Sequence, residues 1–195
     1  MNIIKTTLTT EAMFSDDGHK RFLIHKSWDE SLPKLAIIML APSEASGIEL
    51  DTTTQLVLNN TSRLGYGSVS IVNLFATLND FSLKQATDED AENIDVIIQE
   101  AERADLIVYA PGVGKAKSKV FLNRQEQVLS ALSPFASKLH CLCNSDGNAR
   151  FQHPLSPAVR VWSVVPFDIS QLLTTDKHSN IKVSQKQKKN VKIKD

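Results

Sequence analysis

The chain has 195 residues, of which 42% are hydrophobic and 23% are charged, and its formal net charge at pH 7 is zero. This is ordinary for a globular protein, and the length fits one domain that needs neither disulfides nor metals to build its core. No apolar run approaches the roughly 20 residues of a membrane helix, and the N-terminus lacks a signal peptide's apolar stretch. We therefore expect a cytoplasmic protein without membrane contact.

The zero net charge hides an asymmetry along the chain. Residues 177–195 contain seven Lys and one Asp, whereas the remainder holds 15 Lys and Arg against 21 Asp and Glu. A basic tail can bind phosphate backbones in a salt-sensitive way, and it is also typical of a solvated, disordered terminus. A net negative charge on residues 1–176 is not typical of a protein that binds duplex DNA tightly. We expect one domain over 1–170 and a basic, flexible tail over 171–195.

Apolar runs and turn signals alternate along this domain. Residues 1–20 are expected to be irregular, with a turn at 16–18. The expected strands cover 21–26, 35–40, 68–74, 105–110, 138–143 and 159–165. The expected helices begin at an Asp51 cap and end at Gly65, and then cover 88–104 and 117–132. This alternation predicts an α/β fold, a three-layer α/β/α sandwich with a four- or five-stranded, mostly parallel sheet.

The strongest strand signal is the unbroken apolar run 35–40, LAIIML. A short continuous run that is rich in Ile and ends at Pro42 is typical of a strand buried on both faces. In open α/β sheets, ligands bind just beyond the C-terminal ends of such strands. We therefore expect Ala41, Pro42 and Ser43 at the mouth of a pocket.

A second polar segment, 153–157 (HPLSP), is a candidate for the other wall of that pocket. Its two prolines stiffen the loop, and a rigid loop is a good support for a catalytic or binding group. His153 is the group in question. The alternative is a histidine that only caps the backbone of its own loop.

Asn73 is an amide at the end of an otherwise apolar strand. A buried Asn needs hydrogen-bond partners, which can come from the neighbouring backbone or from a ligand. Its donor and acceptor lie side by side and match the edge of a nucleobase. Capping of the following turn is an equally good interpretation. Phe75 could stack on a base, although an aromatic residue here is more often core.

Three other kinds of site were considered. The segment 111–116 resembles a phosphate-binding loop but lacks the Walker spacing and its terminal hydroxyl residue. A Ser/His/Asp triad could combine Ser43, His153 and either Asp51 or Asp146, but no nucleophile elbow surrounds the serine. The histidines show no paired ligand spacing, and the two cysteines are expected to be reduced core thiols. We expect neither a metal ion nor a cofactor.

The ordered motifs resemble an uncharacterised bacterial and phage family, a domain of unknown function, from Arg21 to Leu155. The residues that carry this resemblance are Arg21, Leu23 and Trp28, then Met39, Leu40, Pro42 and Ser43, then Asp51 and Thr53, then Val72 to Ala76, and finally Asp146, Gly147 and His153 to Leu155. That family in turn is distantly similar to the uracil-DNA glycosylase superfamily in the order of its motifs. The resemblance implies a first motif at 41–43, a base reader at Asn73 and a second motif at His153 and Pro154.

In a site of that kind, cleavage of an N-glycosidic bond leaves negative charge on the departing base. The resemblance implies that His153 stabilises this charge, that Asn73 reads a flipped-out base, and that Ser43 or Asp51 orients the attacking water. Pro42, Phe75 and Pro154 would line the base pocket.

The chain departs from the glycosylase pattern at Ala41, where Asn or Asp is expected. Loss of an acid–base group typically reduces a rate about 10²–10⁴-fold. Glu44, Asp51 or Ser43 would then have to replace it. The first hypothesis is a glycosylase-like domain that recognises a nucleobase in nucleic acid or a nucleotide. Whether this domain also hydrolyses the N-glycosidic bond is left open. The second is a non-catalytic module that holds a nucleotide or a protein in the same cleft.

Overall fold

The computed structural model describes residues 1–43, 47–78, 82, 91–112, 118–144 and 151–170. The strands in this part of the chain are β1 (Thr9–Phe14), β2 (Arg21–Ser27), β3 (Lys34–Met39), β4 (Ser68–Asn73), β5 (Leu106–Tyr109), β6 (Leu139–Cys143) and β7 (Ser163–Pro166). The α-helices are α1 (Thr52–Arg63), α2 (Ala91–Arg103) and α3 (Lys119–Ala131), and short 3₁₀ helices cover Ser133–Lys138 and Pro157–Val159. The expected basic tail, 171–195, lies outside the described residues.

The strands form one mixed sheet in the order β1-β2-β4-β3-β5-β6-β7. The adjacent strands β4, β3, β5 and β6 run parallel, while β1, β2 and β7 pair antiparallel to their neighbours. The α/β class is confirmed, but the prediction of four or five mostly parallel strands is wrong. The error arose at the sheet edges. An antiparallel strand can join its neighbour through a short turn, so no crossover helix in the sequence indicates that the strand belongs to the sheet.

Strand β1 lies in the stretch that was expected to be irregular. Thr9 pairs with Ser27 and Phe14 with Arg21, so β1 extends the sheet beyond β2. Five of its six side chains are exposed, which explains why no apolar run marked it. The expected turn at 16–18 is present: Gly18 has φ +71°, and its N–H donates to the carbonyl oxygen of Ser15 at 2.9 Å.

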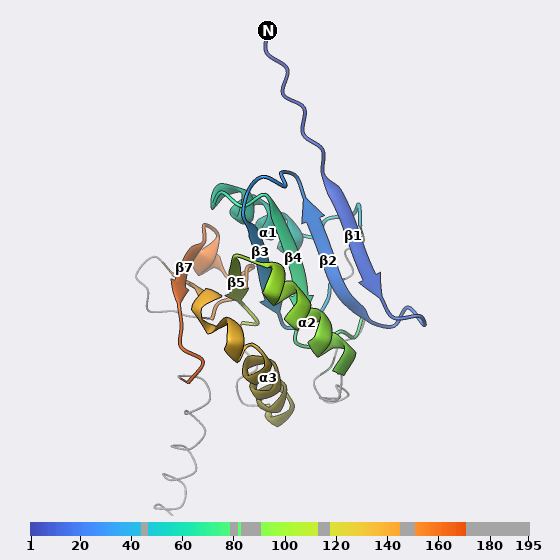
Figure 1. Cartoon of the computed structure of the whole chain (residues 1–195), viewed down its shortest axis with the longest axis vertical. Helices are drawn as coiled ribbons and strands as arrows, with labels where there is room; N and C mark the ends of the chain where they lie inside the picture. The colour runs from blue at the N-terminus through green and yellow to red at the C-terminus, as the bar shows by residue number, and fades with distance from the viewer. Residues whose placement is uncertain (44–46, 79–81, 83–90, 113–117, 145–150, 171–195) are drawn as a thin grey trace, which may run out of the picture.

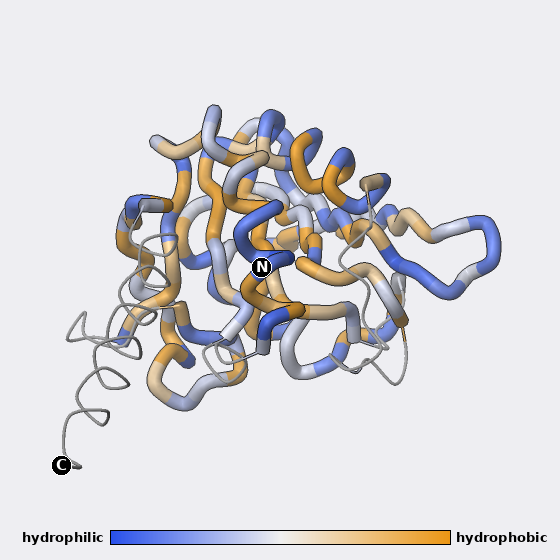
Figure 2. The backbone as a smooth tube through the Cα atoms, turned by 90° about the horizontal axis from the view of Figure 1, so that it is seen from below, coloured by the Kyte–Doolittle hydropathy of each residue, from blue (hydrophilic) through white to orange (hydrophobic). Residues whose placement is uncertain are grey.

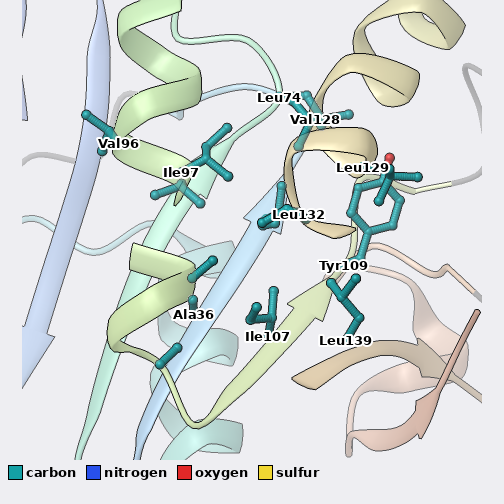
Figure 3. Close-up of a cluster of buried hydrophobic side chains, with 14 of the residues drawn as sticks. Ala36, Leu74, Val96, Ile97, Ile107, Tyr109, Val128, Leu129, Leu132 and Leu139 are labelled. Carbon is teal, nitrogen blue, oxygen red and sulfur yellow. The ribbon is translucent and has the colours of Figure 1, made fainter. Parts of the chain in front are cut away.

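Helices cover both faces of the sheet, as a three-layer sandwich requires (Figure 1). On one face, α2 and α3 pack against the sheet (Figure 3): Ile97 and Leu129 lie in one core with Ala36. On the other face, Val57 of α1 shares a second core with Ile37. Adjacent β3 residues point to opposite cores because side chains alternate along a strand. Figure 2 shows the hydrophobic residues gathered along the central strands.

The helix predictions hold closely. Asp51 is the N-cap of α1, and its Oδ1 accepts the Thr54 N–H at 2.6 Å. α2 and α3 fall inside their predicted ranges. The last strand is shorter than predicted and lies later in the sequence, because Pro157–Val159 winds into a 3₁₀ turn before β7 begins. No helix in the described ranges combines the length and the apolar character that crossing a membrane requires.

The parallel strands end at a common edge, and the chain segments that leave them are hydrogen-bonded together. Leu74 N–H donates to Met39 O at 2.8 Å, and Phe75 N–H donates to Leu40 O at 3.0 Å. Ala110 N–H donates to Ile38 O at 2.8 Å. The expected site residues are therefore delivered to one edge of the sheet.

Candidate functional site

Ser43 and Asp51 lie on the segment between β3 and α1, and they are bonded to each other. The Ser43 hydroxyl donates to the Asp51 carboxylate. Burial by itself raises the pKa of Asp51, but hydrogen bonds from Ser43 and Thr54 and the charge of Arg21 outweigh it and lower the pKa. Asp51 is thus held as an anion and surrounded by donors, which makes it a helix cap and a counter-charge rather than a free base.

Arg21 ties this segment to the first residue of β2. Its guanidinium is almost wholly buried, and Nη1 donates to the Ser43 carbonyl oxygen at 2.9 Å. Its backbone N–H donates to Ala76 O at 2.9 Å, so Arg21 also contacts the segment that follows β4. Burial lowers the pKa of Arg21 to about 10, and the charge of Asp51 partly offsets this. Arg21 remains a cation at neutral pH and fixes the loop after β3.

His153 faces the same cluster from the opposite loop. Burial lowers its pKa below the ordinary value, and the negative charge of Asp51 only partly offsets that. Nδ1 accepts the Leu155 N–H at 3.1 Å. Since a backbone N–H can only donate, the proton of the neutral ring must sit on Nε2. The structure therefore presents His153 as a neutral imidazole with an Nε2–H donor.

Gly112, just beyond β5, packs directly against His153. A Cβ built at Gly112 would lie 3.3 Å from the His153 Cβ. The backbone of Gly112 has φ +83°, which L side chains rarely adopt. Both facts make glycine necessary here, because any side chain would push the histidine loop outward.

The histidine loop is anchored at its start. Phe151 has φ +57°, and its ring packs edge-on against Tyr109 and Phe167, with ring centroids 6.3 and 5.1 Å away. Gln152 N–H donates to Leu142 O at 3.2 Å. Pro154 is buried, as expected of a residue that stiffens the loop. The imidazole is therefore supported by β5 and β6.

Asn73 ends β4 and is fully inaccessible to solvent. Neither amide atom of its side chain has a hydrogen-bond partner among the described residues. The turn after β4 is held by other groups: Asn93 Nδ2 donates to Asn73 O at 3.0 Å and to Leu74 O at 3.2 Å. Arg124 Nε also donates to Leu74 O, at 2.6 Å. Asn73 is not needed as the cap of this turn, so its amide is left for another partner.

Pro42 and Phe75, two of the three apolar residues of the predicted base pocket, differ in position. Pro42 is partly buried in the loop after β3. Phe75 is 3% exposed and belongs to the core beneath α2 and α3, so its ring has no open face on which a base could stack. The core interpretation of Phe75 fits its position better than base stacking does.

The arrangement does not match a Ser/His/Asp triad. In a triad the serine hydroxyl bonds to the imidazole, and the other ring nitrogen donates to the carboxylate. Here the Ser43 hydroxyl donates to Asp51, and Nδ1 of His153 already accepts a backbone N–H. Asp146, the alternative third member, lies outside the described residues, as does most of the segment 111–116.

The structure thus brings together Ser43, Asp51 and His153, which the sequence nominated, and adds Arg21 and Gly112. Both can be noticed in the sequence: Arg21 is a charged residue at the first position of an apolar strand, and Gly112 closes the short segment that follows another. No group of three or more His, Cys, Asp or Glu side chains within the described ranges is placed to hold a metal ion.

A comparison with family models gives one match, to a family described as protein of unknown function (DUF1643), over residues 21–155. These bounds confirm the predicted resemblance to an uncharacterised family. The matched range contains all the site residues described above. No curated protein matches the chain.

Proposed function

This chain belongs to the DUF1643 family of proteins of unknown function, and we propose that it recognises a nucleobase at the C-terminal edge of its parallel strands. The observation that carries the proposal is the side chain of Asn73, which is fully buried with both amide atoms unpartnered among the described residues. The ligand belongs to nucleic acid or to a nucleotide.

The energetics of Asn73 favour a ligand as the missing partner. A buried polar group without a hydrogen bond costs about 1–3 kcal/mol, and an amide has a donor and an acceptor to satisfy. Asn93 and Arg124 already perform the structural capping that would otherwise justify the amide. A nucleobase edge offers an acceptor and a donor side by side, so one base satisfies both atoms.

His153 supplies a complementary donor on the facing loop. Its neutral ring presents Nε2–H, which can donate to a base carbonyl without adding a full charge to the site. The order of these groups along the chain, with a Pro-Ser loop, then Asn73 and then His-Pro, resembles the uracil-DNA glycosylase superfamily. This supports a glycosylase-like mode of base recognition, with the imidazole placed near the base oxygen.

Hydrolysis of the N-glycosidic bond is a second candidate function, and one observation favours it. A neutral Nε2–H donor is suited to stabilise negative charge on a departing base. The groups available to orient water are less suitable: Ala41 has no polar side-chain atom, and Asp51 is bound by Ser43 and Thr54. Recognition therefore fits the geometry better than hydrolysis does.

Access to Asn73 requires movement. Its side chain is 0% exposed, so a base reaches the amide only when the covering residues separate. The Arg21–Ser43 bond ties the loop after β3 to β2 and is one of the contacts that such an opening would strain. We therefore expect association to be slow compared with a preformed pocket.

Calorimetric titration with uracil, nucleosides, nucleoside monophosphates and short single-stranded DNA tests the proposal. We expect saturable binding of at least one of these ligands. Asn73→Leu should bind that ligand about 10–100-fold more weakly, because the variant loses hydrogen bonds worth about 1–3 kcal/mol. Asn123→Ala, on the exposed face of α3, is the matched control and should bind like the parent. Unchanged binding in both Asn73→Leu and His153→Ala would show that the site lies elsewhere.

Abasic-site formation separates recognition from hydrolysis. DNA that contains uracil or modified bases, single- and double-stranded, is incubated with the protein and then cleaved with alkali. We expect base binding without abasic sites. Strand cleavage that disappears in His153→Ala would instead establish the glycosylase activity.

A further inference from the structure

We infer a second ligand site on the opposite side of the fold, which takes a small amphoteric molecule of the free α-amino-acid class. The site is a cavity of about 250 Å³ between the C-terminal end of α2 and the sheet. The residues that line it are Glu11, Leu23, His25, Lys34, Leu35, Ser70, Glu100, Arg103 and Ala104.

The cavity is separate from the proposed nucleobase site. It opens beside Lys34 and Leu35, which begin β3, whereas Ser43 and Asn73 follow the ends of the parallel strands. It exists because α2 lies over β2, β3 and β4 near one side of the sheet (Figure 1). Strand β1 continues the sheet past the helix and leaves the space between them open.

The floor of the cavity is a buried chain of hydrogen bonds. The Ser70 hydroxyl donates to Glu100 Oε2 at 2.5 Å, and Glu100 Oε1 receives Arg103 Nη1 at 2.7 Å. His25 Nδ1 lies 2.9 Å from Ser70 Oγ. Ser70 is 6% exposed and Glu100 is 5% exposed. These polar groups are built into the interior, as the fixed wall of a binding site requires.

The chain fixes which atom faces a ligand. A hydroxyl has one proton, and Ser70 gives it to Glu100, so His25 must donate to Ser70 through Nδ1–H. When the imidazole is neutral, this tautomer has its lone pair on Nε2, which accepts a hydrogen bond. Because Arg103 balances the charge of Glu100, the carboxylate needs no further cation.

Two charges of opposite sign remain at the rim. Glu11 stands opposite His25 in the β1–β2 register, and Lys34 begins β3 on the other side. Neither side chain has a hydrogen bond or an ion pair among the described residues. A ligand that uses both must carry a cationic group and an anionic group.

An α-amino acid meets these conditions. Its ammonium group can donate to the Glu11 carboxylate and to Nε2 of His25, and its carboxylate can bind Lys34. Its side chain would rest on the apolar wall of Leu23 and Ala104. The volume of about 250 Å³ lies below the roughly 300–1,000 Å³ of pockets for drug-sized ligands, so the cavity suits a small molecule better than a nucleotide.

The inference is tested by titrating the chain with each of the common amino acids. Binding is measured by calorimetry and by backbone amide NMR, at amino-acid concentrations up to about 10 mM, so that even a millimolar affinity is detected. We expect saturable binding of at least one amino acid, with shifts at the cavity residues. The same amino acid with its amine acetylated and its carboxyl amidated should not bind.

Variants complete the test. His25→Phe and Lys34→Gln should each weaken binding about tenfold or more, as loss of a charge-assisted hydrogen bond does. His140→Phe in β6 and Lys119→Gln in α3 are the matched controls and should leave affinity unchanged. Because Lys34 is exposed, its variant keeps the test valid if His25→Phe fails to fold. The inference is overturned by an absence of saturable binding, by binding of the blocked amino acid, or by unchanged affinity in Lys34→Gln.

Discussion

Asn73 and Asn93 are both fully buried, and the side chain of Asn93 bonds to the backbone at the end of the strand that carries Asn73. The amide nitrogen of Asn93, in the first turn of α2, donates to two carbonyl oxygens at the end of β4. The side chain of Asn73 lies at the end of that same strand, and it has no hydrogen-bond partner among the described residues. Burial alone therefore does not identify a structural polar residue. The distinction is whether the fold itself satisfies the group.

The strongest test of the structural side of this comparison is Arg124→Met. Arg124 is 0% exposed, and its Nε donates to Leu74 O at 2.6 Å. Methionine keeps part of the apolar stem but leaves this carbonyl without that donor and leaves space in the core. We expect a loss of about 3–5 kcal/mol in the free energy of unfolding, measured by urea denaturation.

Gln127, whose side chain Arg124 also contacts, provides the control. Gln127→Ala removes that exposed contact and should change stability by less than about 0.5 kcal/mol. An Arg124→Met protein as stable as the parent would show that the turn after β4 does not depend on α3.

Asn93→Leu should have the next largest effect. The substitution preserves volume but removes both hydrogen bonds from the amide nitrogen to Asn73 O and Leu74 O. We expect a loss of about 2–3 kcal/mol, since two buried carbonyl groups each lose a partner. Amide hydrogen exchange at Leu74 and Phe75 should accelerate, and unchanged exchange there would contradict the assigned role.

Asn73→Leu should act in the opposite direction. Removing an amide that has no partner relieves its desolvation, so we expect a gain of about 1–2 kcal/mol in thermal and chemical denaturation. The same variant should lose nucleobase binding. A clear destabilisation would mean that Asn73 is a structural residue like Asn93, and the comparison would fail.

Asp51→Asn should give the smallest effect, a modest loss of stability above about pH 4 that disappears in acid. The pKa of Asp51 in the folded state lies below its ordinary value, so its charge contributes stability above the unfolded pKa of about 3.9. That contribution is lost as the pH falls through the lower folded pKa. Because asparagine is also a good N-cap, the variant removes the charge and keeps the cap.

We therefore expect a shallower decline of stability below about pH 4 in Asp51→Asn than in the parent. The measurement is a series of urea denaturation curves across that range. Asp95→Asn serves as the control, because this carboxylate lies in α2, away from the cluster of Arg21 and His153. If the stability of Asp51→Asn and of the parent declined equally steeply below about pH 4, the role of Asp51 as a counter-charge would be contradicted.

The central strands, the helices and the Asp51 cap could be predicted because their signals are local. An apolar run such as 35–40 marks a doubly buried strand wherever it lies, and a cap bonds an N–H only three residues away. The same reasoning predicted Ser43 and Asn73 at or just beyond the ends of parallel strands, since the rule for such sheets depends on strand direction alone.

Strand β1 and the antiparallel direction of β2 and β7 could not be predicted in the same way. The side chains of β1 remain exposed, so its stability comes from backbone pairing with β2 rather than from an apolar face. Pairing of this kind leaves no periodic pattern in the sequence. The sheet consequently has more strands, and a smaller parallel share, than the apolar runs indicated.

The partners of the buried polar groups were decided only by tertiary structure. Arg124 reaches a carbonyl 50 residues earlier in the chain, and Asn93 reaches one 19 residues earlier. The sequence by itself determined that an amide would stand at the end of β4. Whether that amide or another would hold the following turn depended on how α2 and α3 pack, because hydrogen bonds over such separations form only once the layers have met.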